Sequence, residues 1–447
     1  MITDLTISHP RHTLWRFALP MFVSVMFQQF YNLADSMIAG RFAGEDALAA
    51  VGASYPITVI FMAFAVGSNL GASVVVSRLF GAKDFRRMKS AVSTAFLSAG
   101  ILSLALTLSG WFFCEPLMAL IHTPGNIFAD GALYLKIYIY GLVFLFLYNV
   151  CTGIFTALGD SKTPLYFLMG SSVGNIILDY IFVAWFSMGV AGVAWATFIA
   201  QGISALLALT ALMKRLKSVP SEGPSPLFVP ALLAQIAAIA IPSILQQSTL
   251  SIGNLFVQEV VNRFGSATVA GYSAAVKMNT FAINCFMAFG SCLSSYTAQN
   301  LGAKKPERLS LGFREGVRLC MIAAVPFFVG YFFFGRQIMG LFLTGESREA
   351  IRCGVEFLRI LGPMYFMISV KLMTDGIIRG SGAMAYFVAA TIPDLVLRIL
   401  FANILTRYFG STGIWMAWPF GWVATTGLTI LFYRRIITGK FKIPNLQ

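Results

Sequence analysis

The sequence predicts an all-α integral membrane protein, with twelve transmembrane helices in two pseudo-symmetric lobes of six helices each. Three observations predict this fold: scarce charge, long unbroken apolar runs and an internal repeat. Hydrophobic residues make up 57% of the 447 residues and charged residues only 11%, against roughly 25% in an ordinary soluble protein. A soluble globule of this length needs more polar surface, and an outer-membrane barrel needs short alternating strands. Both classes are therefore disfavoured.

Apolar runs bounded by charges, proline and glycine define the expected helices, because about 20 apolar residues cross a bilayer. In the first half they cover residues 14–39, 48–77, 91–113, 133–158, 164–186 and 190–213. In the second half they cover residues 231–262, 267–300, 312–334, 353–378, 384–409 and 412–433. Pro56 and Pro242 are expected bend sites, since proline removes a backbone hydrogen bond inside a helix.

Basic residues explain the net charge of +14 and predict the orientation. One set of loops and termini holds 21 of the 32 Lys and Arg residues, around residues 78–89, 214–217 and 304–318, at the C-terminus, and at Arg379 among a few single positions. Such loops face the cytoplasm. We therefore expect a multi-pass protein of a bacterial plasma (inner) membrane with both termini cytoplasmic, and no binding of nucleic acid.

A Pro-, Ser- and Gly-containing linker over residues 214–230 is the clearest composition break in the chain. It predicts a division into an N-lobe, residues 1–218, and a C-lobe, residues 219–447.

The two halves repeat one another. A shift of 222 positions superposes Pro20 on Pro242 and Asn32 on Asn254. Two longer segments also recur in equivalent helices. They are GSNLGASVVVSRLFGAK at 67–83 with GSCLSSYTAQNLGAK at 290–304, and GIFTALG at 153–159 with GIIRGSG at 376–382. Parallel repeats of this kind predict two lobes related by a two-fold axis along the membrane normal.

Polar side chains at membrane depth are the candidate functional residues, because such groups are costly unless they have a role. In the first half they are Asp35, Asn175, Asp179 and Thr197, on three different helices at a similar depth. A carboxylate in low dielectric favours uptake of a proton, or of Na⁺ together with neighbouring oxygens. These four residues are therefore the predicted coupling site, with any Na⁺ at Asp35, Asn175 and Asp179. The alternative is structural: Asp35 caps its helix, Asp179 is hydrogen-bonded, and Thr197 bonds its own helix.

The second half differs, since Val257 stands at the position that matches Asp35. Lys371 with Asp375, and Asp394 with Arg398, are spaced i, i+4 and are expected to neutralise each other. Polar side chains that could line a substrate cavity are Gln28, Asn32, Tyr138, Asn254, Gln246, Asp375, Asp394 and Arg398. In the fifth expected helix, Gly170 and Gly174 predict a close approach of another helix.

The sequence resembles the multidrug and toxic compound extrusion (MATE) family over essentially its whole length, within the MOP-type transporters. The resemblance rests on NLADSMIAGRFAG at 32–44, the two repeat segments that end in Gly-Ala-Lys, the Gly159-Asp160 turn and the Asn175-x-x-x-Asp179 motif. Within the family the chain resembles the DinF-like and MepA-like bacterial branch, whose first-lobe site matches Asp35, Asn175, Asp179 and Thr197. The acid that the NorM-like branch has in the seventh helix is absent.

The resemblance implies a secondary active multidrug exporter that works by alternating access. Amphipathic organic cations and drugs would leave the cell in exchange for H⁺ or Na⁺, and the ion and the drug would compete for the same carboxylates. A lipid-linked oligosaccharide flippase of the same superfamily is the alternative. We expect no enzymatic activity, no cofactor besides the coupling ion, and no metal site beyond that for Na⁺. The expected partners are cationic small-molecule drugs and membrane lipids, and the expected state is a monomer.

Overall fold

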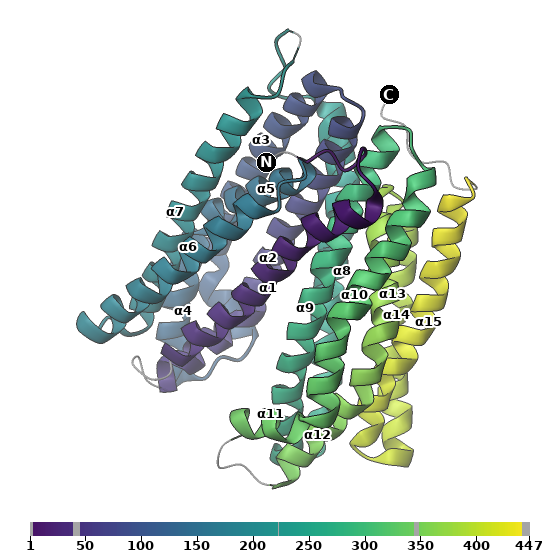
Figure 1. Cartoon of the computed structure of the whole chain (residues 1–447). Coiled ribbons are helices and arrows are strands. Elements are labelled where there is room, and N and C mark those ends of the chain that lie inside the picture. The colour runs from purple at the N-terminus through teal and green to yellow at the C-terminus, as the bar shows by residue number, and fades with distance from the viewer. Residues whose placement is uncertain (1–2, 39–44, 222, 344–347, 440–447) are drawn as a thin grey trace. The chain divides into compact units, whose positions relative to one another are not determined.

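The computed structural model describes residues 3–38, 45–221, 223–343 and 348–439 (Figure 1). In the helices, the side chains of residues 33–38, 45, 46, 48, 250, 252 and 255 also lie outside the description. The described residues form helices joined by short turns, without a strand. The all-α prediction is therefore confirmed.

Two compact units make up the chain. Unit 1 comprises residues 1–4 and 23–244, and unit 2 comprises residues 5–22 and 245–447. The predicted lobes, 1–218 and 219–447, stay a prediction, since the unit boundaries cut through two helices instead of the linker. These two helices are α1 (Pro10–Ile38) and α8 (Pro230–Asn262).

The remaining helices each belong to one unit. Those of unit 1 are α2 (Glu45–Gly81), α3 (Phe85–Leu120), α4 (Gly125–Tyr140), α5 (Leu142–Ala157), α6 (Lys162–Asp179), a π-helix (Tyr180–Trp185) and α7 (Gly189–Lys217). Those of unit 2 are α9 (Ser266–Gly302), α10 (Glu307–Phe333), α11 (Gly335–Phe342), α12 (Arg348–Leu361), a 3₁₀-helix (Gly362–Met364), α13 (Tyr365–Gly380), α14 (Met384–Phe409) and α15 (Thr412–Ile437).

Each of the twelve expected spans falls on a described helix or helix pair. In the described part of the chain, nine helices are long and apolar enough to cross a membrane, or ten if α4 and α5 form one span. The count of twelve spans therefore stays a prediction. Sequence analysis missed two features: the short helix α11, and a bend of 48° between α4 and α5 at Gly141.

The first parts of α1 and α8 pack in the unit opposite to the rest of their helices. In unit 2, Met21 Sδ of α1 lies 3.1 Å from Cys292 Sγ, and Phe22 stacks on Phe289 at 5.3 Å between ring centroids. In unit 1, Gly67 and Gly71 of α2 lie against α8 around Ile244 and Ile236. The two crossing points, after residues 22 and 244, are 222 positions apart, which is the spacing of the sequence repeat.

The two Gly-Ala-Lys segments hold the N-terminal residues in place, each within its own unit. In unit 1, Lys83 pairs with Asp4, and Thr3 N–H donates to the carbonyl of Leu158. In unit 2, four side chains bind the backbone of residues 5–8. They are Gln299, which accepts from Leu5 N–H, and Asn300, Lys305 and Arg308, which donate to the carbonyls of Leu5, Thr6 and Ser8.

Close helix packing uses other glycines than the sequence predicted. A Cβ atom on Gly153 of α5 would lie 2.8 Å from the carbonyl oxygen of Asn69, and one on its repeat equivalent Gly376 would lie 2.5 Å from the carbonyl oxygen of Gly290. Among the described residues outside the α6 backbone, no atom lies within 4 Å of a Cβ added to Gly170 or Gly174. The prediction of close packing at that glycine pair is wrong.

Replacing Gly153 with alanine should destabilise the protein, because its new methyl group meets backbone that cannot move away. We expect a loss of about 1–3 kcal/mol, typical of overpacked sites, seen as a lower thermal unfolding midpoint of the purified protein in detergent. Gly170→Ala is the matched control, since α6 has open space there, and it should unfold at or slightly above the wild-type temperature. Equal midpoints for the two variants would contradict this account of the packing.

Candidate functional site

Asn175 is the centre of a buried polar network in unit 1. The amide lies in α6 with only 2% of the residue exposed. Its Oδ1 accepts a hydrogen bond from the Tyr31 hydroxyl of α1 at 2.6 Å, and its Nδ2 donates to Thr197 Oγ1 of α7 at 3.5 Å, the long limit for such a bond. Three helices thus bring a phenol, an amide and a hydroxyl together.

Asp179 lies one helical turn beyond Asn175 on the same face of α6. It is fully buried, and it is the last residue of α6 before the π-helix. Single π-turns are rare and frequently mark functional sites. The backbone of Asp35 lies in α1, while its side chain lies outside the described residues. The predicted coupling site therefore has Asn175, Asp179 and Thr197 on adjoining elements, and the place of Asp35 in it stays a prediction.

Tyr31 is the functional candidate that the sequence reading missed. It lies one turn before Asp35 on α1, on the helical face already marked by Gln28 and Asp35. Tyrosine counts as apolar in hydropathy, so its hydroxyl gave no polar signal. In contrast, Gln28 and Asn32 on the same helix are exposed.

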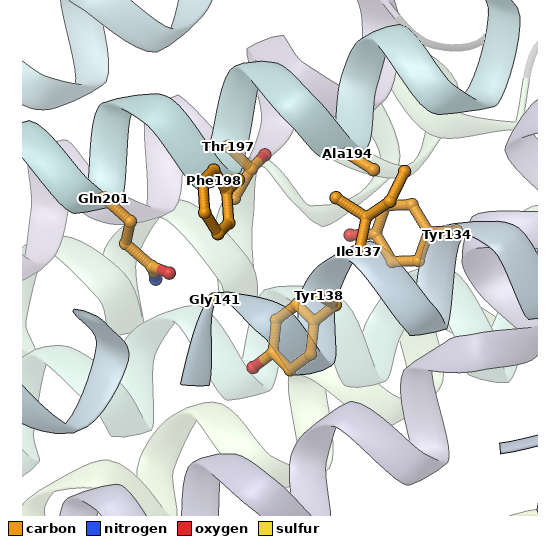
Figure 2. A pocket seen from close by; sticks show the side chains of 8 residues that line it. All are labelled: Tyr134, Ile137, Tyr138, Gly141, Ala194, Thr197, Phe198 and Gln201. Carbon is orange, nitrogen blue, oxygen red and sulfur yellow. The ribbon is translucent and has the colours of Figure 1, made fainter. Parts of the chain in front are cut away.

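A small cavity adjoins this network between α4 and α7 (Figure 2). It has room for about one water molecule. Thr197 lines it and so belongs to both the cavity and the network. The other lining residues are Tyr134, Ile137, Tyr138, Gly141, Ala194, Phe198 and Gln201. The hydroxyl of Tyr138 is buried and has no hydrogen-bond partner among the described residues, so the cavity offers one water polar partners.

Unit 2 contains the two ion pairs that the spacing predicts. Lys371 Nζ lies 2.9 Å from Asp375 Oδ2, and Arg398 Nη2 lies 3.0 Å from Asp394 Oδ2. All four residues are buried. Removal of one member of a pair would leave an uncompensated buried charge. Each pair therefore stabilises unit 2 only while both of its members are present.

Arg398 also contacts two further helices of unit 2. Its Nη1 donates to Asn254 Oδ1 of α8 at 3.2 Å, and its guanidinium lies 4.4 Å from the ring centroid of Trp418 on α15. Gln246, also on α8, is half-buried. The expected cavity residues thus fall into separate groups: Tyr138 lines the cavity of unit 1, whereas Asn254, Asp394 and Arg398 form one cluster in unit 2.

One residue was misassigned from the sequence. Arg379 was counted among the bases of cytoplasmic loops, but it lies in the last turn of α13 and only 4% of it is exposed. The apolar run ends near this position, and hydropathy alone cannot distinguish the end of a buried helix from the start of a loop.

The chain matches a known family model once in each half, and it is similar to known proteins over nearly its whole length. The MatE family model matches twice, over residues 20–181 and 242–404. The probable multidrug resistance protein YpnP of Bacillus subtilis is 29% identical over 445 residues, which is 99% of this chain and 98% of that protein. The multidrug export protein MepA of Staphylococcus aureus is 23% identical over 400 residues, 89% of this chain and 88% of that protein.

A solved structure shows the same fold. The structure of a MOP superfamily transporter from Pyrococcus furiosus superposes with a TM-score of 0.92 over 98% of both chains, at 24% sequence identity. The starts of the two family-model matches, residues 20 and 242, again lie 222 positions apart. The internal repeat is therefore a property that the family model recognises in each half.

A double-mutant cycle on Lys371 and Asp375 should reveal strong coupling. We expect Lys371→Met and Asp375→Asn each to destabilise the protein by about 3–5 kcal/mol. Each substitution removes one charge of the pair and leaves the other charge buried without this partner. The double variant should lose much less than the sum of the two, measured by thermal unfolding in detergent.

The exposed pair Arg263 and Glu259, with 2.9 Å between charged atoms and more than 60% of each side chain exposed, is the matched control. Arg263→Met and Glu259→Gln should leave the unfolding midpoint unchanged. If the buried pair behaved in the same way as this surface pair, its assignment as a coupled pair would be wrong.

Proposed function

The chain belongs to the MatE family, as the resemblance predicted, and on that premise we propose that it is a secondary active exporter that moves amphipathic organic cations and drugs out of the cell in exchange for H⁺ or Na⁺. The observation that carries this proposal is the buried polar network of unit 1, where Asn175 and Thr197 adjoin the fully buried Asp179. The relatives whose names describe multidrug resistance and multidrug export support the class of activity.

Asp179 supplies the ion-binding chemistry in this proposal. An ionised carboxylate with no exposed surface is costly, so binding of H⁺ or Na⁺ lowers the free energy of the buried state. An organic cation has the same effect on a carboxylate. The coupling ion and the exported cation therefore compete, and this competition links release of one to uptake of the other.

Asn175 orients the groups around the carboxylate. Its carbonyl oxygen is engaged by Tyr31 and its amide nitrogen by Thr197, so its side chain is fixed at both ends. A change in the charge of Asp179, one turn away, acts on this chain of hydrogen bonds and through it on α1 and α7. Asp35, one turn beyond Tyr31 on α1, is the second proposed carboxylate of the site.

The membrane orientation follows from charge. The basic loops place both termini in the cytoplasm of a bacterial plasma membrane. The ion gradient sets the direction of transport, since it drives H⁺ or Na⁺ inward across such a membrane and the exchanged cation outward.

Replacing Asp179 with asparagine should abolish coupled export. The asparagine amide has nearly the same shape as the carboxylate, but it carries no negative charge for the coupling ion and the substrate cation to bind in turn. We expect export, measured as uptake of the fluorescent organic cation ethidium into everted vesicles, to fall at least about tenfold, with the amount of protein in the membrane unchanged. Asp130→Asn, at an exposed acid of α4, is the matched control and should transport normally. Wild-type efflux by the Asp179 variant would overturn the assignment.

Proteoliposomes with one imposed gradient at a time test the coupling itself. We expect either a proton gradient or a sodium gradient, but not an equal potassium gradient, to drive ethidium movement, because H⁺ or Na⁺ is the proposed coupling ion. Transport without dependence on any gradient would contradict antiport. Movement of a lipid-linked sugar across the same liposomes would favour the flippase alternative.

A further inference from the structure

Arg379 is a buried cation of unit 2 that no carboxylate neutralises directly. Within the described chain its guanidinium makes no hydrogen bond and no ion pair within 4.0 Å, and its Nε atom is inaccessible and without a partner. The guanidinium makes a cation–π contact with the ring of Phe387, and its central carbon lies 5.6 Å from the ring centroid. A guanidinium stays charged at any physiological pH, so the charge must be balanced in another way.

The buried charges of α13 and α14 do not cancel, although Asp375, one helical turn before Arg379, acts on it electrostatically. Helices α13 and α14 bury three bases and two acids, of which Lys371 pairs with Asp375 and Arg398 with Asp394. Arg379 is the fifth charge and leaves this group with a net charge of +1. A buried charge without a partner is strongly unfavourable, and a single negative charge would neutralise the group.

Two hydroxyl groups on the neighbouring helix α9 also lack partners. The Oγ of Ser294 and the Oγ1 of Thr297 are buried and form no hydrogen bond with the described residues. They lie on the same face of α9, against α13. A Cβ on Gly380 would lie 2.3 Å from the carbonyl oxygen of Ser294 and 2.7 Å from the Cβ of Thr297.

The guanidinium of Arg379 extends to this same face of α9. Its Nη2 lies 3.4 Å from the position of a Cβ on Gly290, and Gly290 is one helical turn before Ser294. Glycine at 290 leaves the space that the guanidinium occupies. A charged N–H donor and two O–H donors are thus arranged along one seam between α9 and α13.

The repeat shows that these donors are additions to unit 2. In the superposed segments, Arg379 corresponds to Thr156, Ser294 to Gly71 and Thr297 to Val74. In unit 1 the hydroxyl of Thr156 bonds its own helix, at 2.8 Å from the carbonyl oxygen of Thr152. One close-packing glycine is kept in both units, Gly153 in unit 1 and Gly376 in unit 2, whereas Gly380 corresponds to Ala157. Unit 2 therefore has the same framework with three donors placed where unit 1 has none available.

We propose that Arg379, Ser294 and Thr297 form a binding site for a small monovalent anion, of which chloride is the physiological candidate. The single excess positive charge selects a monovalent anion. The burial of all three donors and the close contact of α9 with α13 favour a compact ion over a phosphate or a headgroup. The bound anion stabilises unit 2 and is not part of the coupling site of unit 1.

Thermal unfolding of the purified full-length protein in detergent tests this site. Potassium chloride should raise the unfolding midpoint by roughly 2–4 °C over potassium gluconate of equal ionic strength, because a ligand stabilises the state that binds it. Arg379→Gln should remove this chloride response and, in gluconate, should unfold at or above the wild-type temperature. Arg407→Gln, at an exposed arginine of α14, changes the net charge equally and should keep the response.

A second variant covers the case in which Arg379→Gln does not fold. Ser294→Ala combined with Thr297→Val keeps the arginine and should raise the chloride concentration for half-maximal stabilisation several-fold. Acetate and phosphate titrations compare the anion classes, and chloride should act at the lowest concentration. In crystals soaked in bromide, the anomalous signal should lie within hydrogen-bonding distance of the Arg379 guanidinium.

Several results would overturn the proposal. One is an equal unfolding midpoint in chloride and in gluconate, and another is a chloride response that persists in Arg379→Gln. The others are stabilisation by phosphate at a lower concentration than chloride, and bromide that binds only at sites away from Arg379. None of these measurements involves transport, so the anion site can fail while the exporter function stands, and the reverse also holds.

Discussion

A polar group buried inside this protein cannot reach bulk water, so it needs a partner within the chain or a bound water or ion. The backbone meets this requirement by forming helices throughout the described residues. Side chains meet it by pairing across helices, as Asn175 does with Tyr31 and Thr197. The arrangement of both units can be understood as the placement of a few polar groups whose partners are supplied by neighbouring helices.

The two units satisfy this constraint in different ways on a shared framework. In unit 1 the buried acid Asp179 lies one helical turn from the Asn175 amide, which forms hydrogen bonds with the hydroxyls of Tyr31 and Thr197. Unit 2 pairs its acids with bases, as in Asp394 and Arg398, which fixes their charges. A buried pair of opposite charges cannot easily exchange one member for an ion, so the coupling chemistry is proposed for unit 1 although the halves are repeats.

Sequence patterns predicted those features that depend on composition and helical period. The long helices followed from apolar runs, and the approach of Asn175 and Thr197 followed from matched depth on neighbouring helices. The bend at Gly141 was not predicted, because residues 133–158 form one continuous apolar run and a single glycine does not show where such a run bends. Tyr31 was missed because a hydroxyl on an aromatic ring has little weight in hydropathy. Gly170 and Gly174 misled because a small-residue spacing permits close packing without requiring it.

The exchange of helix segments between the units constrains how the chain folds during synthesis. Unit 1 includes residues up to 244, which form the first part of α8. Until this part of α8 has been synthesised, the face of α2 that packs against it stays uncovered. Conversely, residues 5–22 are made first but belong to unit 2, and they must wait for almost the entire chain. Neither half can finish folding before the other is under way. If synthesis stopped at the central linker, residues 5–22 would lack their unit 2 partners and α2 would lack the α8 segment that packs against it.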